Sequence, residues 1–262
     1  MSPTFLDKII ESTRERVASQ RVSADIDELR SQAAASRSSR PPNALRSALR
    51  QKDRINVIAE FKRASPSKGV INNKIDIVDQ VQTYQRGGAC AISVLTEEQY
   101  FRGSINDLRE VRSTVDLPIL RKDFTIDEFQ IYEAAAAGAD AILLIVAALT
   151  SENLRAFQTL AHALGMDAIV EVHSADELEI ASEIGARIIG VNNRNLKTFD
   201  VSLDVSRELI GYRPDGAMMI AESGISSREQ IEELKSLGFD GFLVGESLMR
   251  ATGTQKMLEA LI

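Results

Sequence analysis

Five charged residues stand at the ends of short apolar segments that are rich in β-branched residues. They are Glu60, Lys62, Lys122, Glu171 and Glu222, and the amide Asn192 ends a further segment. Ammonium and carboxylate groups that lie together shift each other's proton affinity, which suits general acid–base catalysis. Burying such charges is costly unless they pair with one another or with a ligand. A structural layer of ion pairs is the competing interpretation, and for five groups at four segment ends we favour catalysis.

A second set of residues suits the binding of an anion. The segment 62–69 contains three basic residues, two serines and no acidic residue, although a solvated basic loop would look the same. Ser223-Gly224 and Gly245-Glu246 form glycine turns that lead into predicted helices, and such turns bind phosphate through backbone N–H groups. The formal net charge of −7 argues against a general nucleic-acid binder, so an anionic ligand needs a local positive site.

Eight apolar segments must position these residues. They span 57–62, 89–95, 117–122, 140–146, 168–172, 187–191, 218–222 and 240–244. Stretches between them, such as 151–164 and 175–184, have helical periodicity, and Thr150, Ser151 and Ser227 are candidate N-caps. Four glycines precede alternate strands and would end the preceding helix, namely Gly88, Gly138, Gly185 and Gly238. This α/β alternation predicts a single eight-stranded parallel (β/α)8 TIM barrel.

In this fold, catalysis takes place at the carboxyl ends of the strands. Alternation along a strand places Glu60 and Lys62 on one face, which we expect to point into the barrel mouth. The same argument turns Glu171 and Glu222 inward. His173 is expected to face away from Glu171 or to lie in a loop, with a structural role.

Residues 1–56 have no strand of this repeat and predict a helical extension packed on a catalytic barrel of residues 57–262. Apolar residues between Phe5 and Val17 form a stripe on a first helix, and a second helix begins near Ile26. The segment 33–42 is predicted as a linker, and 43–49 as a short third helix. A cap under the barrel and a lid over its active face remain equally open.

Several classes of protein are excluded by composition. No apolar run approaches the roughly 20 residues that span a bilayer, and the N-terminus lacks the order of a secretion signal. Cys90 is the single cysteine and is expected in the core, which fits a reducing cytoplasm. No residue cluster matches a metal site, and no dinucleotide-binding glycine motif follows a strand.

Six longer stretches resemble signature motifs of the indole-3-glycerol phosphate synthase family. They are 58–67 (IAEFKRASPS), 93–104 (SVLTEEQYFRGS), 120–124 (LRKDF), 190–196 (GVNNRNL), 221–225 (AESGI) and 244–249 (VGESLM). The first three are specific, whereas the glycine motifs are shared with other phosphate-binding barrels. Together they run from the first predicted strand to the last in the family's order.

The resemblance implies the indole-forming ring closure of tryptophan biosynthesis. The substrate would be 1-(o-carboxyphenylamino)-1-deoxyribulose 5-phosphate, and the products indole-3-glycerol phosphate, carbon dioxide and water. By similarity, Lys122 is expected to be the general acid on the substrate ketone and Glu171 the general base of the dehydration. Lys62 and Glu60 would assist, and the division of roles between Lys62 and Lys122 stays open. No cofactor is expected.

The resemblance also implies which residues contact the substrate. Ser65, Asn192 and Arg194 are expected to hold the carboxylate and the hydroxyls, and Ser223 and Glu222 also lie in the family's site. The phosphate is expected on the amides of Gly224, Gly245 and Glu246, near Lys62. A dry pocket favours the decarboxylation, and its candidate walls are Phe101, Phe124, Leu143 and Leu196.

Three alternatives remain. Lys122 beside Glu171 could form a Schiff base, as in an aldolase. A sugar isomerase of the same phosphate-binding barrels would move protons without releasing carbon dioxide, and a ligand-binding barrel would catalyse nothing. We expect a small phosphorylated substrate as the partner, no nucleic acid and no membrane. A monomer is expected, while the oligomeric state and a complex with neighbouring pathway enzymes stay open.

Overall fold

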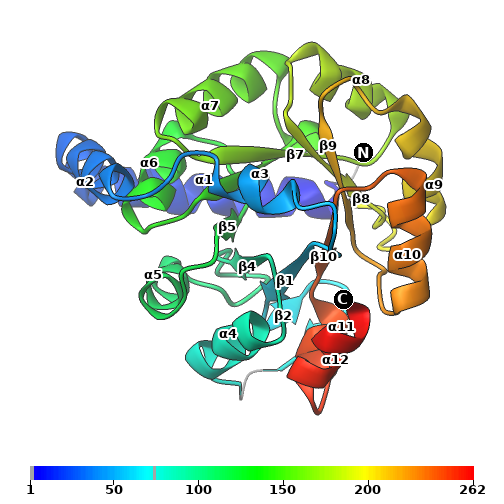
Figure 1. Cartoon of the computed structure of the whole chain (residues 1–262). Helices are drawn as coiled ribbons and strands as arrows, with labels where there is room; N and C mark the ends of the chain where they lie inside the picture. Colours follow the sequence, from blue (N-terminus) through cyan, green and yellow to red (C-terminus); the bar gives the residue numbers. More distant parts are fainter. Residues whose placement is uncertain (1–2, 73–74) are drawn as a thin grey trace.

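The structure is a computed structural model that describes residues 3–72 and 75–262; the first two residues of the predicted extension lie outside it. Eight parallel strands close into a barrel in the order β1-β10-β9-β8-β7-β6-β5-β4 (Figure 1). They are β1 (Val57–Phe61), β4 (Ala91–Leu95), β5 (Ile119–Lys122), β6 (Ala141–Ile145), β7 (Asp167–Val172), β8 (Ile188–Asn192), β9 (Met218–Glu222) and β10 (Gly241–Val244). The prediction of a (β/α)8 barrel is confirmed. Six strands lie within their predicted segments, β7 begins one residue earlier and β8 ends one residue later.

Helices surround the barrel on the outside. They are α4 (Ile77–Arg86), α5 (Ile105–Thr114), α6 (Glu128–Ala136), α7 (Ser151–Ala163), α8 (Ala175–Glu183), α9 (Asp204–Leu209), α10 (Arg228–Leu237), α11 (Glu246–Arg250) and α12 (Thr254–Leu261). Short 3-10 turns follow β6 (Val146–Ala148) and α9 (Ile210–Tyr212), and a small hairpin of β2 (Ala64–Ser65) and β3 (Gly69–Val70) follows β1.

The predicted signals at the helix ends are largely confirmed. Thr150 and Ser227 are N-caps whose side chains accept hydrogen bonds from backbone N–H groups, whereas Ser151 is the first residue inside its helix. The four glycines that precede alternate strands, at positions 88, 138, 185 and 238, all have positive φ, a conformation that glycine adopts without steric cost.

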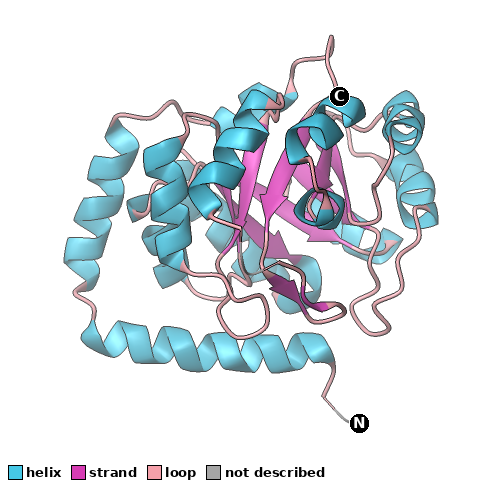
Figure 2. Ribbon diagram, turned by 90° about the horizontal axis from the view of Figure 1, so that it is seen from below, coloured by secondary structure: helices cyan, strands magenta, loops and turns pink. Residues whose placement is uncertain are grey.

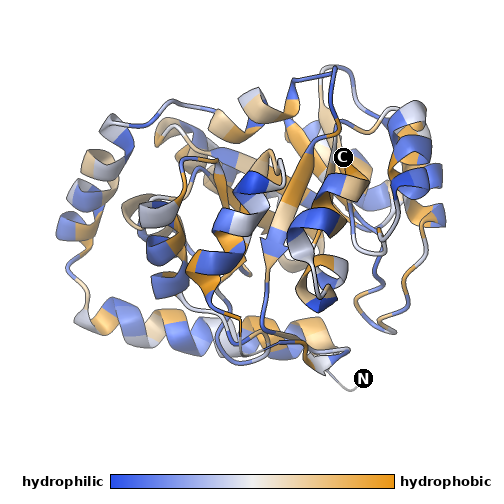
Figure 3. Cartoon of the chain, turned by 60° about the horizontal axis from the view of Figure 1, so that its bottom comes forward, coloured by the Kyte–Doolittle hydropathy of each residue, from blue (hydrophilic) through white to orange (hydrophobic). Residues whose placement is uncertain are grey.

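Apolar side chains form two layers, one inside the barrel and one between the strands and the helices. Inside the barrel, Ile58, Leu120, Ile169 and Ile220 belong to one buried cluster. The apolar neighbours of these residues along each strand point outward and belong to the larger cluster under the helices. Figure 3 shows hydrophobic residues concentrated on the strands and hydrophilic residues on the outer helices. Cys90 is buried in the inner cluster, as predicted.

The linker predicted over 33–42 is wrong in its first half, because α2 (Ile26–Ser38) continues through it. This stretch looks unstructured in the sequence because its residues are small and polar, but small residues let two helices approach closely. Ala33 is fully buried, and α2 packs against α6. Arg37 is also buried and donates hydrogen bonds to Asp140 and to backbone carbonyls of the α7–β7 turn.

The extension covers both ends of the barrel. The helix α3 (Ala44–Leu49) closes the amino-terminal end, where Leu45 and Leu49 join the inner cluster and the Arg46 amide donates to Asp167 at the start of β7. The helix α1 (Phe5–Ser23) crosses the opposite end of the barrel, and α2 runs along its side (Figure 2). The sequence left open a cap under the barrel and a cover over its active face. The structure shows both, because α3 is the cap and α1 is the cover.

Candidate active site

The carboxyl ends of the strands surround a cavity of about 720 Å³. Every residue that the sequence predicts for the site lines this cavity: Glu60, Lys62, Ser65, Phe101, Lys122, Phe124, Leu143, Glu171, Asn192, Arg194, Leu196, Glu222, Ser223, Gly224, Gly245 and Glu246. They come from all eight strands or from the loops that follow them. Parallel strands bring together residues far apart in sequence because all their carboxyl ends meet at one rim.

Strand alternation positions the charged groups. Glu60 lies between Ala59 and Phe61, which both belong to the outer apolar cluster, so Glu60 must point into the barrel. Glu171 lies between Val170 and Val172 of the same cluster, and Glu222 follows Ala221, which also belongs to it. All three carboxylates are almost completely buried. Their burial at one mouth means that each needs a positive partner.

Lys122 is that partner for two of the carboxylates. Its Nζ lies 2.8 Å from Oε2 of Glu171 and 2.5 Å from Oε2 of Glu222. Burial by itself lowers the pKa of Lys122, but the carboxylates of Glu171, Glu222 and Glu60 outweigh burial and raise it. Lys122 therefore rests as an ammonium group with protons to donate.

Two carboxylates share this one ammonium group, and their environments differ. Burial raises the pKa of Glu171, but Lys122 and His173 outweigh burial and lower it, which keeps Glu171 ionised. Burial raises the pKa of Glu222 to about 7 although Lys122 opposes the shift. Oε1 of Glu222 has no hydrogen-bond partner within residues 3–72 and 75–262, so the charged form is poorly solvated.

Two glycines make room for the carboxylates. A Cβ atom on Gly190 would lie 2.2 Å from Oε1 of Glu222, and one on Gly245 would lie 2.4 Å from Oε1 of Glu60. No residue other than glycine fits at either position without moving a carboxylate. Glu60 in turn lies 2.7 Å from Nζ of Lys62, which forms a second acid–base pair beside Lys122.

The basic loop after β1 divides into two parts. Arg63 turns away from the cavity and forms a two-pronged ion pair with Asp107 at 2.6 and 2.8 Å. Lys62 and Lys68 line the cavity. Lys62 and Lys68 are thus available to an anion in the cavity, whereas Arg63 has a structural role.

The glycine turns lie where phosphate-binding barrels hold their ligand, after the last two strands and before a short extra helix. Ser223 and Gly224 have φ values of 64° and 82°, so two successive residues adopt a left-handed conformation. Ser223 is not a glycine and therefore stores backbone strain, which is common at functional sites. Gly245 is the N-cap of α11, and the Glu246 side chain is turned toward Arg250, with Oε1 3.2 Å from Nε.

Arg194 spans the cavity from β8 to the loop after β1. Its Nη1 donates to Oγ of Ser67 at 3.1 Å and to the carbonyl of Phe199 at 3.2 Å. Its backbone N–H donates to Oδ1 of Asn192. These contacts hold the guanidinium at the cavity edge in an orientation that suits a carboxylate ligand.

The apolar wall includes residues that the sequence did not assign to the site. Phe101 and Phe124 lie 6.2 Å apart between ring centroids, as expected for two residues of one wall. Phe5, Leu6 and Ile9 of α1 complete it. The apolar stripe of α1 is visible in the sequence and could have indicated these wall residues. The sequence does not show, however, which end of the barrel the stripe covers.

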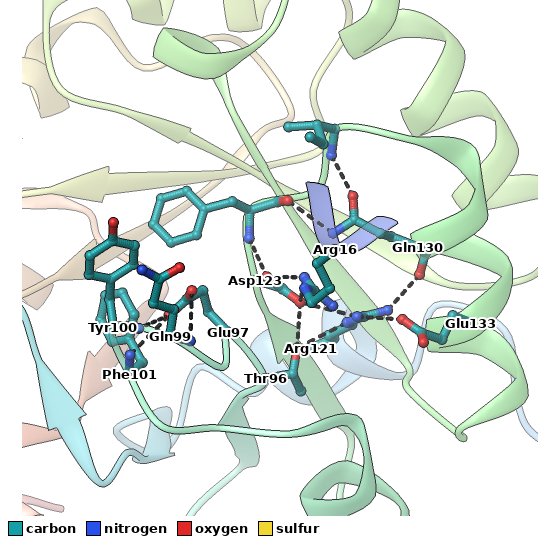
Figure 4. A network of polar contacts seen from close by, with 12 residues as sticks. Arg16, Thr96, Glu97, Gln99, Tyr100, Phe101, Arg121, Asp123, Gln130 and Glu133 are labelled. Carbon is teal, nitrogen blue, oxygen red and sulfur yellow. Dashed lines mark hydrogen bonds and ion pairs between the residues drawn. The ribbon is translucent and has the colours of Figure 1, made fainter. Parts of the chain in front are cut away.

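A polar network ties α1 to the strand that carries Lys122 (Figure 4). Asp123 accepts hydrogen bonds from Arg16 of α1, from Arg121 and from the Thr96 hydroxyl. Arg121 also bonds Glu133 of α6 at 2.7 Å. The lid helix is therefore fixed to the residue that follows Lys122.

Of the two positions expected for His173, the loop is confirmed, but the ring points toward Glu171 and not away from it. Nε2 of His173 lies 3.4 Å from Oε1 of Glu171, and Nδ1 lies 3.1 Å from Oε2 of Glu177. The strand β7 ends at Val172 and the chain turns at once into α8, whose N-cap is Ser174. Alternation does not apply beyond the last strand residue, so the turn brings His173 back toward Glu171.

Two further observations concern ligands and membranes. Among residues 3–72 and 75–262, no group of three histidine, cysteine, aspartate or glutamate side chains could hold a metal ion. In the same part of the chain, no helix is both long enough and apolar enough to cross a bilayer.

A closed (β/α)8 barrel with a buried lysine between carboxylates at its active rim defines a TIM-barrel enzyme. The profile of the indole-3-glycerol phosphate synthase family matches residues 6–261, and the chain belongs to this family. It is 47% identical to the indole-3-glycerol phosphate synthase of Carboxydothermus hydrogenoformans, over 98% of this chain and 99% of that protein. The synthase of Koribacter versatilis is 45% identical over the full length of both chains.

Solved structures share the fold at low identity. The 3-hexulose-6-phosphate synthase of Salmonella typhimurium aligns with a TM-score of 0.64 and 14% identity, over 79% of this chain and 96% of that one. Thiamine phosphate pyrophosphorylase of Pyrococcus furiosus aligns with a TM-score of 0.60 and 20% identity, over 83% and 95%. At these identities the likeness concerns the barrel alone.

Proposed function

We propose that this protein closes the indole ring of indole-3-glycerol phosphate, with Lys122 as the general acid and Glu171 as the general base. The substrate is 1-(o-carboxyphenylamino)-1-deoxyribulose 5-phosphate. The observation that carries the proposal is the position of Nζ of Lys122 between Glu171 and Glu222, 2.8 and 2.5 Å away. It keeps a proton donor and a proton acceptor ready in one buried site.

Lys122 acts in the first step. The aromatic carbon that bears the carboxylate attacks the ketone carbon, and Lys122 donates a proton to the ketone oxygen, which becomes a hydroxyl group. The developing charge on that oxygen is stabilised by an ammonium group already in place, so little reorganisation is needed. Carbon dioxide then leaves, and the electron pair of the broken bond restores the aromatic ring.

Glu171 acts in the dehydration. It removes a proton from the carbon next to the nitrogen as the hydroxyl group leaves as water, and the indole double bond forms. The leaving hydroxyl takes its proton from an ammonium group of Lys122 or Lys62. Glu60 supports Lys62 through their 2.7 Å ion pair. Asn192 and Ser223 contact the reacting atoms from the β8 and β9 rims.

The two ends of the substrate are held by different groups of residues. Arg194 and Ser65 bind the anthranilate carboxylate, with Asn192 and Glu222 on the ribulose hydroxyls. The phosphate binds to the amides of Gly224, Gly245 and Glu246, near Lys62, in the position that barrels of this kind use. Phe101, Phe124, Leu143 and Leu196 keep water away from the ring during decarboxylation.

The proposal also includes the role of the extension, the oligomeric state and the location of the protein. Residues 1–56 act as one unit on the barrel of residues 57–262, with α1 as the lid. The protein is a monomer that works in the cytoplasm on a small phosphorylated substrate, without a nucleic-acid or membrane partner.

The test is the appearance of indole fluorescence after the substrate is added to the purified protein. The chain contains no tryptophan, so its own emission at indole wavelengths is low. We expect a rising signal that is lost in Lys122→Ala and kept in Lys52→Ala, an exposed lysine away from the cavity. No signal with bound substrate would favour a ligand-binding barrel or a sugar isomerase, and no binding would refute the proposed function.

One rival chemistry uses the same lysine. An amine nucleophile would form a Schiff base with the ketone, and borohydride would then attach the substrate to Lys122. Mass spectrometry after borohydride treatment distinguishes the two mechanisms. We expect no adduct on Lys122, because its carboxylate partners keep it protonated and therefore not nucleophilic.

A further inference from the structure

A line of three side chains leads from Lys122 toward the surface. The two oxygens of the Glu171 carboxylate have different partners: Oε2 lies 2.8 Å from Lys122, and Oε1 lies 3.4 Å from Nε2 of His173. The other nitrogen of the imidazole, Nδ1, lies 3.1 Å from Oε2 of Glu177. Glu171 is thus held between an ammonium group and an imidazole ring.

The outer end of this line reaches solvent, and Glu177 orients it. The His173 side chain is 13% exposed and that of Glu177 is 22% exposed, whereas Glu171 is 3% exposed. One oxygen of Glu177 accepts both the backbone N–H of His173, at 2.7 Å, and Nδ1 of its ring. This double contact orients the resting ring so that Nε2 faces Glu171. Within residues 3–72 and 75–262, Nε2 is buried and has no hydrogen-bond partner, so Glu171 at 3.4 Å is the group placed to receive its proton.

The proposed reaction consumes one proton in each turnover, by charge balance. The substrate enters with a carboxylate that leaves as neutral carbon dioxide, and the oxygen leaves as neutral water. Two protons are given to the departing oxygen, and one is recovered from carbon by Glu171. The buried site therefore ends each turnover one proton short and must be refilled from solvent.

We propose that His173 supplies this proton, passing it from solvent through Glu171 to Lys122, and that Glu177 holds the imidazole in place for the transfer. This inference rests on the proposed function. The N–H bond at Nε2 breaks and an O–H bond forms on Glu171; that bond then breaks as the N–H bond on Lys122 re-forms. The ring keeps its other proton on Nδ1 during this transfer. Because Nε2 is buried in the resting site, the ring turns about its Cβ–Cγ bond to bring Nε2 to water, takes the replacement proton there and turns back.

The charges around His173 suit a proton store. Burial lowers the pKa of His173, but hydrogen bonds and charges from Glu171 and Glu177 outweigh burial and raise it to about 9. Lys122 lies on the other side of Glu171, 2.8 Å from Oε2. At neutral pH the ring thus holds a second proton between two carboxylates, and it can give that proton up when Lys122 has become a neutral amine.

The test compares the first turnover with steady-state turnover in His173→Ala and His173→Gln. The resting site starts with its protons in place, so the first turnover in both variants should keep the rate of the unchanged protein. The steady-state kcat should fall by about tenfold or more in both variants, because refilling becomes limiting. Imidazole buffer should restore kcat in proportion to its concentration. The control is His162→Gln on α7, the other histidine of the chain, which should change nothing.

Glutamine separates proton transfer from simple positioning. Its amide can still donate a hydrogen bond to Glu171, but it has no proton that it can release at neutral pH. Full activity in His173→Gln would overturn the proposal. A first turnover that slows as much as kcat, with no rescue by buffer, would also overturn it. These results require an unchanged protein that forms indole, so they are distinct from a failure of the proposed function, in which that protein forms none.

Discussion

Arg16 of the lid helix α1 donates hydrogen bonds to both carboxylate oxygens of Asp123, at 3.2 and 3.0 Å, and Asp123 directly follows Lys122 (Figure 4). Burial alone raises the pKa of Asp123, but Arg121 and Arg16 outweigh it and lower the pKa, so the carboxylate stays charged. The segment that closes the cavity is thus bonded to the strand that carries the proposed acid.

The first prediction concerns this contact. Arg16→Met should raise KM more than it lowers kcat, because the docked position of α1 loses hydrogen bonds to a charged group, which are worth about 1.5–3 kcal/mol and so about tenfold or more in docking. Hydrogen exchange of the α1 amides should accelerate as well. The control is Arg14→Met, since Arg14 is exposed and pairs with Glu11 of its own helix. Equal KM values for Arg16→Met and the unchanged protein would contradict this prediction.

The second prediction concerns the space beside Glu222. Gly190→Ala should lower kcat by about a hundredfold, because the new Cβ would lie 2.2 Å from Oε1 of Glu222, and a displacement of about 1 Å in an active site costs that much. Circular dichroism should show an intact barrel. The matched control is Gly211→Ala, where no atom lies within 4 Å of the new Cβ. Comparable kcat values for the two variants would show that the position of Glu222 does not matter.

The third prediction concerns Arg194. Arg194→Ala should raise KM by about tenfold or more with a smaller change in kcat. The reason is that the variant loses a charge-assisted contact to the substrate that is made equally in the ground state and in the transition state. Arg194→Lys should recover only part of the affinity, since lysine cannot form a two-pronged contact. Lys197→Ala, an exposed neighbour in the same loop, is the control. A defect confined to kcat would assign Arg194 to the chemistry instead.

The fourth prediction concerns pH. The pKa of Glu222 is raised from 4.5 in the unfolded chain to about 7 in the folded protein. The folded state therefore binds more protons than the unfolded state between these values, and the free energy of unfolding must fall as pH rises through this window. The contribution of Glu222 is fully present below about pH 4.5 and lost above about pH 7.

Glu222→Gln removes this titration, so the dependence of Tm on pH between 5 and 7.5 should become flatter in the variant. Glu208→Gln, which changes an exposed carboxylate on α9, should keep the original slope. A slope unchanged by Glu222→Gln would mean that the carboxyl group titrates at its ordinary pKa.

The barrel and the composition of its rim could be predicted from local patterns. Each strand is buried on both faces, so it reads as a continuous apolar run, and a charged residue inside such a run, such as Glu60 or Glu171, stands out. Alternation then gives its direction. This reasoning is local, because it needs only the residues on either side.

The same reasoning failed where contacts are made between distant elements. The residues 33–38 look like a linker because small residues carry no strong helical pattern, yet they form the part of α2 that packs on α6. His173 lies in the loop after β7, one of the two positions expected for it, but alternation gives no sign that its ring points toward Glu171. The left-handed conformation of Ser223 has no signal in its residue type, since serine rarely adopts it.

The sequence by itself determined the eight strands, the residues gathered at their carboxyl ends and the family, since apolar periodicity and motif identity are properties of neighbouring residues. Only the tertiary structure decided that Lys122 lies between Glu171 and Glu222, that α1 covers the mouth while α3 closes the opposite end, and that His173 faces Glu171. The physical reason is that the proton affinity of a buried group depends on charges a few ångströms away. In a closed barrel, those charges come from strands that are far apart along the chain.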